Sequence, residues 1–171
     1  RETTPDSPEL AFAERLAVMA RFRAGLVAEI DTLATTLTRE VGKPITQSRN
    51  ELNGLLPRID FFLAQTQAAI ADEPVFSDAG MRERIQHIPL GVVGNISAWN
   101  YPYFVGCNVI VPALLTGNVV LYKPSEFATL TGQLATNTAR LAEAENRITG
   151  FEAQVAGLLA ERDAALGQAA A

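Results

Sequence analysis

Two short polar runs each follow directly on a predicted strand. The run 97–100, Ser-Ala-Trp-Asn, comes after an apolar segment that ends at Ile96, and the run 123–126, Lys-Pro-Ser-Glu, comes after the apolar segment 119–122. Ligands bind beyond the carboxyl ends of the strands in an open parallel sheet, so we expect both runs to line one crevice. Taken alone, Asn100 also fits a turn residue, and Lys123 and Glu126 also fit a strand-end lysine and a first-turn helix acid.

The elements before these runs have the periodicity of helices. Apolar residues recur at helical spacing from Glu9 to Val41 and again from about Thr46 to Ile70. This spacing predicts two helices in the first range and a further helix in the second, within a helical region over 9–72. We expect a break around 25–31, a stop at Gly-Lys-Pro over 42–44, and a kink or division at Pro57.

The segment that carries the polar runs predicts a βαβ unit over about 84–132. Residues 74–80 are expected to form a loop and 82–88 an edge strand. A buried strand over 90–96, a helix opened by Pro102, and a strand over 118–122 covered on both faces are expected next, before a further helix from Pro124. The fold class is therefore α/β, a partial doubly wound, Rossmann-like domain with a helical N-terminal region.

Residues 133–171 differ in composition and are rich in alanine, glutamate and leucine. Leu134, Leu141, Ile148 and Val155 stand seven residues apart, which is the spacing of a coiled coil. The pattern predicts a long C-terminal helix, although glycines such as Gly150 weaken it. Whether this helix pairs with another molecule or folds back on the domain stays open.

Composition limits the partners of the chain. The 171 residues carry a formal net charge of −5 and the basic residues are scattered, which argues against nucleic acid. No apolar run is long enough to span a membrane. A lone cysteine, Cys107, favours a reducing, cytoplasmic setting, and we expect it to be a structural apolar residue. The single histidine, His87, has no partners for a metal site or a catalytic triad, so no metal is expected.

Five motifs, taken together and in this order, resemble the N-terminal part of the aldehyde dehydrogenase family. They are Glu40-Val41-Gly42-Lys43-Pro44, Pro89-Leu90-Gly91-Val92-Val93, Trp99-Asn100-Tyr101-Pro102, Pro112-Ala113-Leu114-Leu115-Thr116-Gly117-Asn118 and Lys123-Pro124-Ser125-Glu126. The resemblance covers residues 9–132, about three quarters of the chain, and the tail from Gln133 resembles nothing in the family. We therefore divide the chain into a truncated NAD-binding region, 1–132, and a helical tail, 133–171.

The resemblance implies an NAD(P)-binding domain that lacks the usual glycine-rich turn, as does this sequence. By resemblance, the cofactor cleft is lined by Ile96, Ser97, Ala98 and Trp99. Lys123 and Glu126 match the pair that holds the adenosine ribose hydroxyls, with Ser125 beside them. A carboxylate at this place repels a 2′-phosphate, so NAD is favoured over NADP.

The same resemblance implies that the chain is catalytically incomplete. Asn100 matches the residue whose side-chain amide stabilises negative charge on the carbonyl oxygen of a small-molecule aldehyde as it is oxidised to an acid. The family's cysteine nucleophile and glutamate base lie beyond residue 132, and Cys107 does not match the nucleophile. The first hypothesis is an inactive aldehyde dehydrogenase fragment. The alternatives are a weak nucleotide-binding module and a scaffold that self-associates through helix 133–171 or an exposed sheet edge.

Overall fold

The computed structural model describes residues 8–135, 137, 138, 152 and 154–161. Three helices come first: α1 (Pro8–Ala28), α2 (Ile30–Val41) and α3 (Ile45–Ala69). They are followed by β1 (Glu73–Ser77), β2 (Arg82–Ile85), β3 (Val92–Ile96), α4 (Pro102–Leu115), β4 (Val119–Lys123) and the 3-10 turn η1 (Glu126–Ala128). The predicted helices before residue 70 and the predicted strand, helix and strand over β3, α4 and β4 are thus confirmed.

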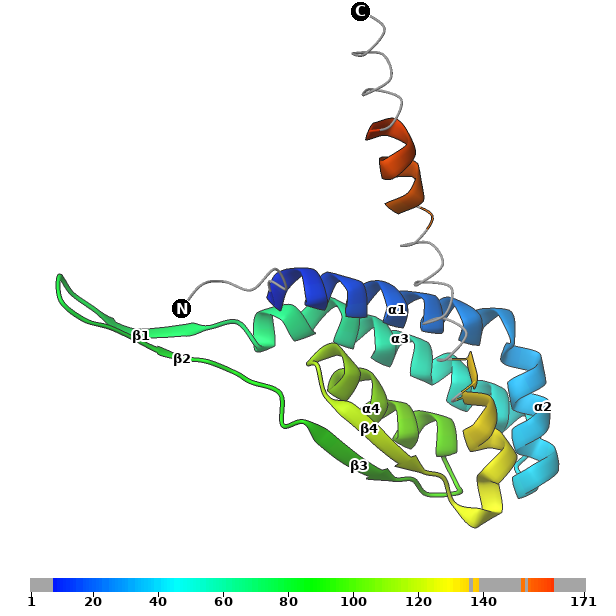
Figure 1. Cartoon of the computed structure of the whole chain (residues 1–171). Coiled ribbons are helices and arrows are strands. Elements are labelled where there is room, and N and C mark those ends of the chain that lie inside the picture. Colours follow the sequence, from blue (N-terminus) through cyan, green and yellow to red (C-terminus); the bar gives the residue numbers. More distant parts are fainter. Residues whose placement is uncertain (1–7, 136, 139–151, 153, 162–171) are drawn as a thin grey trace, which may run out of the picture.

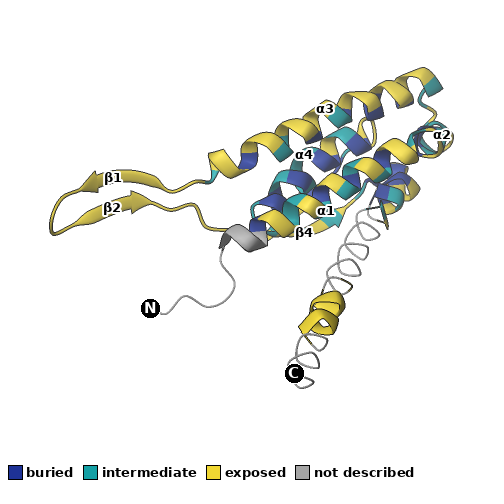
Figure 2. Cartoon of the chain, turned by 90° about the horizontal axis from the view of Figure 1, so that it is seen from above, coloured by how far each residue is buried: buried dark blue, intermediate teal, exposed yellow. Residues whose placement is uncertain are grey.

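The helical region forms because its apolar faces bury one another. Figure 1 shows α1 and α3 side by side, with α4 between them and the strands β3 and β4. The buried positions face the space between these helices (Figure 2). Large, fully buried side chains from every one of the four helices build this core, among them Phe22, Leu26, Leu33, Leu37, Leu52, Leu55, Ile59 and Leu115.

The breaks between the helices lie where the sequence predicts them. The α1–α2 junction is at Glu29, inside the expected range, and Gly42 ends α2 in the left-handed conformation at φ 76°. Pro57 does not divide the next helix, because α3 continues through it from Ile45 to Ala69. Leu55 and Ile59, on either side of the proline, are both fully buried, so tertiary packing holds this stretch helical.

The loop predicted over 74–80 is wrong in part. Residues Glu73–Ser77 form strand β1, which pairs antiparallel with β2 in a hairpin that projects from the helical body (Figure 1). Every residue of both strands is exposed, so β1 has no buried stripe that would mark it as a strand. The edge strand predicted over 82–88 is confirmed for its first half, Arg82–Ile85.

The βαβ unit is confirmed, but its strands are covered on only one face by the described residues. β3 and β4 pair in parallel, and α4 packs on both. Side chains alternate along a strand, so Asn95 faces α4 and donates a hydrogen bond of 3.1 Å to the Gly106 carbonyl. On the other face Val92, Val119 and Leu121 are 59–66% exposed, contrary to the expectation of strands buried on both sides.

The C-terminal segment is described only in pieces. Residues 129–135, 137, 138, 152 and 154–161 are helical, and all of 154–161 are exposed. Figure 1 shows 154–161 apart from the helical layers. Leu141 and Ile148 of the seven-residue pattern lie outside the described residues, so the long helix and the coiled coil stay predictions.

Candidate functional site

The two polar runs meet at the carboxyl edge of the parallel strand pair. In the register of this pair Ile96 lies beside Lys123, and the Ser97 amide donates a hydrogen bond of 3.0 Å to the Lys123 carbonyl. The loop 97–101 and the segment 124–128 therefore start from neighbouring strand ends. The structure brings together the two runs that the sequence predicts to share one edge.

An aromatic contact joins the two runs beyond the strand ends. The rings of Trp99 and Phe127 meet edge to face, with centroids 5.9 Å apart and an interplanar angle of 75°. Both side chains are about half exposed. Ile96 is 79% exposed, on the same open face of the sheet as Lys123, whereas Ala98 is half-buried. The site edge therefore offers apolar and aromatic surface to a ligand from solvent.

Lys123 and Glu126 form the charged part of this edge. The Lys123 Nζ atom lies 3.6 Å from a Glu126 carboxylate oxygen, and both side chains are mostly exposed. The pKa of Glu126 is lowered by a hydrogen bond from its own backbone amide and by the charge of Lys123. At neutral pH the pair is thus an exposed carboxylate beside an ammonium, able to accept and to donate hydrogen bonds.

The two serines of the runs are buried and serve the backbone. Ser125 caps η1, since its Oγ atom accepts a hydrogen bond of 3.2 Å from the Phe127 amide. The Ser97 hydroxyl lies 3.5 Å from the Pro102 carbonyl. In this structure both serines fix the loops at the strand ends.

Asn100 lies in the exposed loop between β3 and α4. Its side-chain amide makes no hydrogen bond to any residue that the structure describes, so its donors are available to a ligand. Its backbone is held instead, because the Asn100 carbonyl accepts a hydrogen bond of 2.9 Å from the Lys43 Nζ atom. The position of this loop therefore depends on a residue far away in the sequence.

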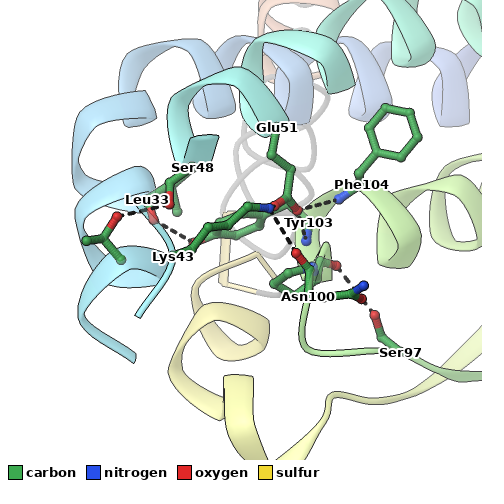
Figure 3. Close-up of polar contacts among 10 residues, drawn as sticks. Leu33, Lys43, Ser48, Glu51, Ser97, Asn100, Tyr103 and Phe104 are labelled. Atoms are coloured by element: carbon green, nitrogen blue, oxygen red, sulfur yellow. Dashed lines mark hydrogen bonds and ion pairs between the residues drawn. The ribbon is translucent and has the colours of Figure 1, made fainter. Parts of the chain in front are cut away.

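Lys43 and Glu51 form a buried charged pair behind the Asn100 loop (Figure 3). Their charged atoms are 2.6 Å apart, with 8% of the Lys43 side chain and none of the Glu51 side chain exposed. The ammonium also lies 3.5 Å from the centre of the Tyr101 ring. The other Glu51 oxygen accepts hydrogen bonds of 2.9 and 3.1 Å from the amides of Tyr103 and Phe104, at the start of α4. One carboxylate thus binds both the cation and a helix N-terminus.

Glu40 makes a similar contact with the segment that follows the other polar run. Its carboxylate accepts hydrogen bonds from the Leu130 amide at 2.7 Å, the Thr131 amide at 2.8 Å and the Thr131 hydroxyl at 2.7 Å. Burial raises the pKa of Glu40, but the hydrogen bonds from Thr131 and Leu130 outweigh it and leave the pKa below its ordinary value. Sequence reasoning assigned no role to Glu40, Lys43 or Glu51. The motif over 40–44, which contains Glu40 and Lys43, is the feature of the sequence that could have indicated a role for these two residues.

The remaining candidate side chains lie away from this edge. Cys107 is a fully buried residue of α4, and burial raises the pKa of its thiol to about 12. It is therefore an apolar packing residue, as expected. His87 is exposed and lies 3.7 Å from the Glu73 carboxylate. No group of three or more His, Cys, Asp or Glu residues that could hold a metal ion occurs in the described part of the chain. None of the described helices is long and apolar enough to cross a membrane.

Comparisons with known proteins agree with this arrangement. N-succinylglutamate 5-semialdehyde dehydrogenase of Chromohalobacter salexigens is 34% identical over 135 residues, which make up 78% of this chain and 27% of that enzyme. Succinic semialdehyde dehydrogenase of Streptococcus pyogenes, solved in complex with NADP+, superposes with a TM-score of 0.72 at 21% identity and covers 80% of this chain and 30% of its own. An NAD-dependent benzaldehyde dehydrogenase of Corynebacterium glutamicum superposes with a TM-score of 0.70 at 25% identity, and the match covers 77% of this chain and 29% of that enzyme.

The chain therefore spans only about a quarter of the length of this curated relative. The sequence profile described as "Aldehyde dehydrogenase family" matches residues 1–171. That match reaches beyond residues 9–132, which carry the five motifs, and includes the segment from Gln133. Because the profile spans the whole sequence, this chain belongs to the aldehyde dehydrogenase family.

Proposed function

We propose that this chain supplies one wall of the cofactor site, and the hydrogen-bond donor for the substrate carbonyl, of an enzyme that oxidises an aldehyde to a carboxylic acid. The parallel register that sets Ile96 beside Lys123 carries the proposal, because it puts the Asn100 loop and the Lys123–Glu126 pair at one edge. This is the edge at which doubly wound sheets bind nucleotides.

The residues at this edge suit a dinucleotide. A carboxylate and an ammonium side by side match the donor and acceptor character of ribose hydroxyls, so Lys123 and Glu126 are proposed to hold the adenosine ribose, with Ser125 fixing the turn between them. The segment Ile96, Ser97, Ala98 and Trp99 is proposed to line the cofactor. When bound, the cofactor accepts the hydride that leaves the substrate carbon.

NAD is the proposed cofactor in preference to NADP. Glu126 is an exposed carboxylate with a pKa below its ordinary value, and a carboxylate beside the ribose repels a 2′-phosphate. The similar enzymes include both an NADP+ complex and an NAD-dependent enzyme, so the preference rests on Glu126 alone.

Asn100 is the proposed donor to the substrate. Attack on an aldehyde carbonyl leaves negative charge on oxygen, and a fixed amide stabilises that charge without reorganising. The Asn100 side-chain amide has donors available for that oxygen, and the Asn100 backbone is anchored by the hydrogen bond from Lys43. A semialdehyde is the first substrate class to assay in the whole enzyme, since the similar enzyme of Chromohalobacter salexigens is named for one.

By itself the chain is proposed to lack dehydrogenase activity, because the reaction needs an accessible thiolate and Cys107 is fully buried with a raised pKa. The free thiol is compatible with the cytoplasm, which is the proposed setting. Scaffolding through self-association stays a second proposal, favoured by the exposed apolar face of β3 and β4.

Titration of the purified chain with NAD+ by calorimetry tests the proposal. With one wall of the site, we expect a dissociation constant of about 1 mM. Lys123→Ala is expected to weaken NAD+ binding, whereas Arg39→Ala, which removes an exposed cation of α2 outside this edge, leaves it unchanged. Binding that is indifferent to Lys123→Ala, or absent at high NAD+ concentration, contradicts the proposed cofactor edge.

A further inference from the structure

The site has two halves: the Asn100 half, which is the loop 97–101, and the Lys123–Glu126 half, which is the segment 123–128. One charged side chain from the corner between α2 and α3 serves each of them. Glu40 stands in the last turn of α2, Gly42 ends that helix, and Lys43 follows before α3 begins. The left-handed Gly42 turns the chain sharply between the two charged residues. Two side chains three positions apart thereby reach contacts on two different loops.

The Lys43 contacts all belong to the Asn100 half. Its ammonium bonds to the Asn100 carbonyl, faces the Tyr101 ring and pairs with Glu51 (Figure 3). Glu51 in turn accepts the first free amides of α4, the helix that begins directly after this loop. The loop therefore contacts the helical body at three points: the Asn100 carbonyl, the Tyr101 ring and the start of α4.

The hydrogen bonds that Glu40 accepts from described residues lie on the side of the Lys123–Glu126 pair. They engage Leu130 and Thr131, which lie in the helical turn directly after η1. Because η1 begins at Glu126, the carboxylate fixes the helix start just beyond the proposed ribose-binding pair. A carboxylate at this place also complements the partial positive charge of helix amides.

We propose that Glu40 and Lys43 are positioning residues for the two halves of the site, Glu40 for the nucleotide end and Lys43 for the carbonyl end. The inference rests on the proposed function for the identity of the ligands. Neither residue is assigned a contact with a ligand, since each acts through backbone groups of the residues that would make one.

Amide NMR spectra of the isotope-labelled full chain test the inference directly. Lys43→Met is expected to displace the amide signals of Asn100 and Tyr101 and to leave those of Leu130 and Thr131 in place. Glu40→Gln is expected to do the reverse. Arg39→Met and Glu29→Gln, which change exposed charges in the last turn and at the start of α2, are expected to move neither set.

Titrations with AMP and with NAD+ distinguish the two halves of the site. AMP carries only the adenosine half, so Glu40→Gln is expected to weaken both AMP and NAD+ by about threefold or more. Lys43→Met is expected to weaken NAD+ and to leave AMP unchanged, because the loop that Lys43 holds also carries Ala98 and Trp99, which are proposed to line the cofactor. If either variant fails to fold, Glu40→Asp or Lys43→Arg replaces it, and the same pattern over the two loops is required.

The outcomes distinguish the two proposals. If the unchanged chain binds neither AMP nor NAD+, the proposed function fails, while the amide pattern still decides whether each side chain positions its own loop. If both variants disturb both loops alike, or disturb neither, the division of labour between Glu40 and Lys43 is overturned whatever the ligands do.

Discussion

Glu51 shows how one side chain can satisfy two requirements of a buried site. A buried carboxylate costs free energy unless a counter-charge and hydrogen bonds compensate it. Here Lys43 provides the charge and the amides of Tyr103 and Phe104 provide hydrogen bonds to the other oxygen. The site loop is tied to the same cation, so disturbing the pair is expected to disturb the loop as well.

A double-mutant cycle tests the coupling of this pair. Lys43→Met and Glu51→Gln each leave one buried charge without its partner, so each is expected to lower the free energy of unfolding by about 3 kcal/mol. The double variant has no unpaired charge, and its Gln can still accept from the helix amides. Its free energy of unfolding, measured with urea, is therefore expected to fall by clearly less than the sum of the two single losses.

The exposed pair Arg49–Asp31, 2.9 Å apart, provides the control for this cycle. Arg49→Met is expected to change stability by about 1 kcal/mol or less, because water screens an exposed ion pair. Strictly additive losses at Lys43 and Glu51 would contradict the coupling.

The lowered pKa of Glu40 makes the free energy of unfolding depend on pH. Its pKa is lower in the folded chain than in the unfolded one, where about 4.3 is usual. The stabilisation is therefore complete above the unfolded pKa and is lost as pH falls through the folded pKa. Glu40→Gln is expected to cost about 1 kcal/mol at pH 7, and the difference from the unchanged chain is expected to shrink below about pH 4.3. Urea unfolding at both pH values measures it, and a difference constant with pH contradicts the assignment.

At the scale of an element, the turn at Gly42 fixes how α2 and α3 meet. Its φ of 76° is costly for a residue with a Cβ atom, although no atom lies within 4 Å of where that Cβ would stand. Gly42→Ala is therefore expected to lower stability by about 1 kcal/mol through backbone strain alone. Gly54, in the interior of α3, also has open space, and Gly54→Ala is expected to raise stability by about 0.5 kcal/mol. Thermal unfolding of both variants checks the opposite signs.

The elements that could be predicted from the sequence are those with a buried stripe. The helices α1 to α4 carry apolar residues at helical spacing, and each buries them. The β1–β2 hairpin buries nothing. Only its second strand is predicted from the sequence, within the edge strand over 82–88, and β1 could have been indicated only by the turn. There the Asp78 carboxylate accepts hydrogen bonds of 2.8 and 2.7 Å from the Gly80 and Met81 amides. Pairing between the two exposed strands is a contact between chain segments, which no single-strand pattern contains.

The site was predictable where it follows from strand order and unpredictable where it follows from packing. Two parallel strands necessarily bring their carboxyl ends together, so the meeting of the two polar runs at one edge, with Ile96 beside Lys123, could be expected. The contact of Lys43 with the Asn100 carbonyl spans 57 positions, and that of Glu40 with Leu130 spans 90. Such contacts depend on how α2 and α3 meet α4, which local sequence does not define.

At the scale of the whole molecule, the open face of the β3–β4 pair is the main structural liability. Parallel strands are normally covered on both faces. Here α4 covers one, and Val92, Ile96, Val119 and Leu121 are 59–79% exposed on the other. These side chains form a contiguous apolar surface over two neighbouring strands, and such surfaces favour association.

We therefore expect the purified chain to self-associate through this face as its concentration rises. Leu121→Thr removes apolar surface, keeps a residue suited to a strand, and is expected to shift the sedimentation profile towards the monomer. Val75→Thr makes a comparable change in the hairpin, where Val75 is 60% exposed, and is expected to leave association unchanged. Deleting residues 133–171 tests the predicted coiled coil in the same assay. A chain that stays monomeric at every concentration contradicts the open-face account, and association lost only on this deletion would assign the contact to the C-terminal segment instead.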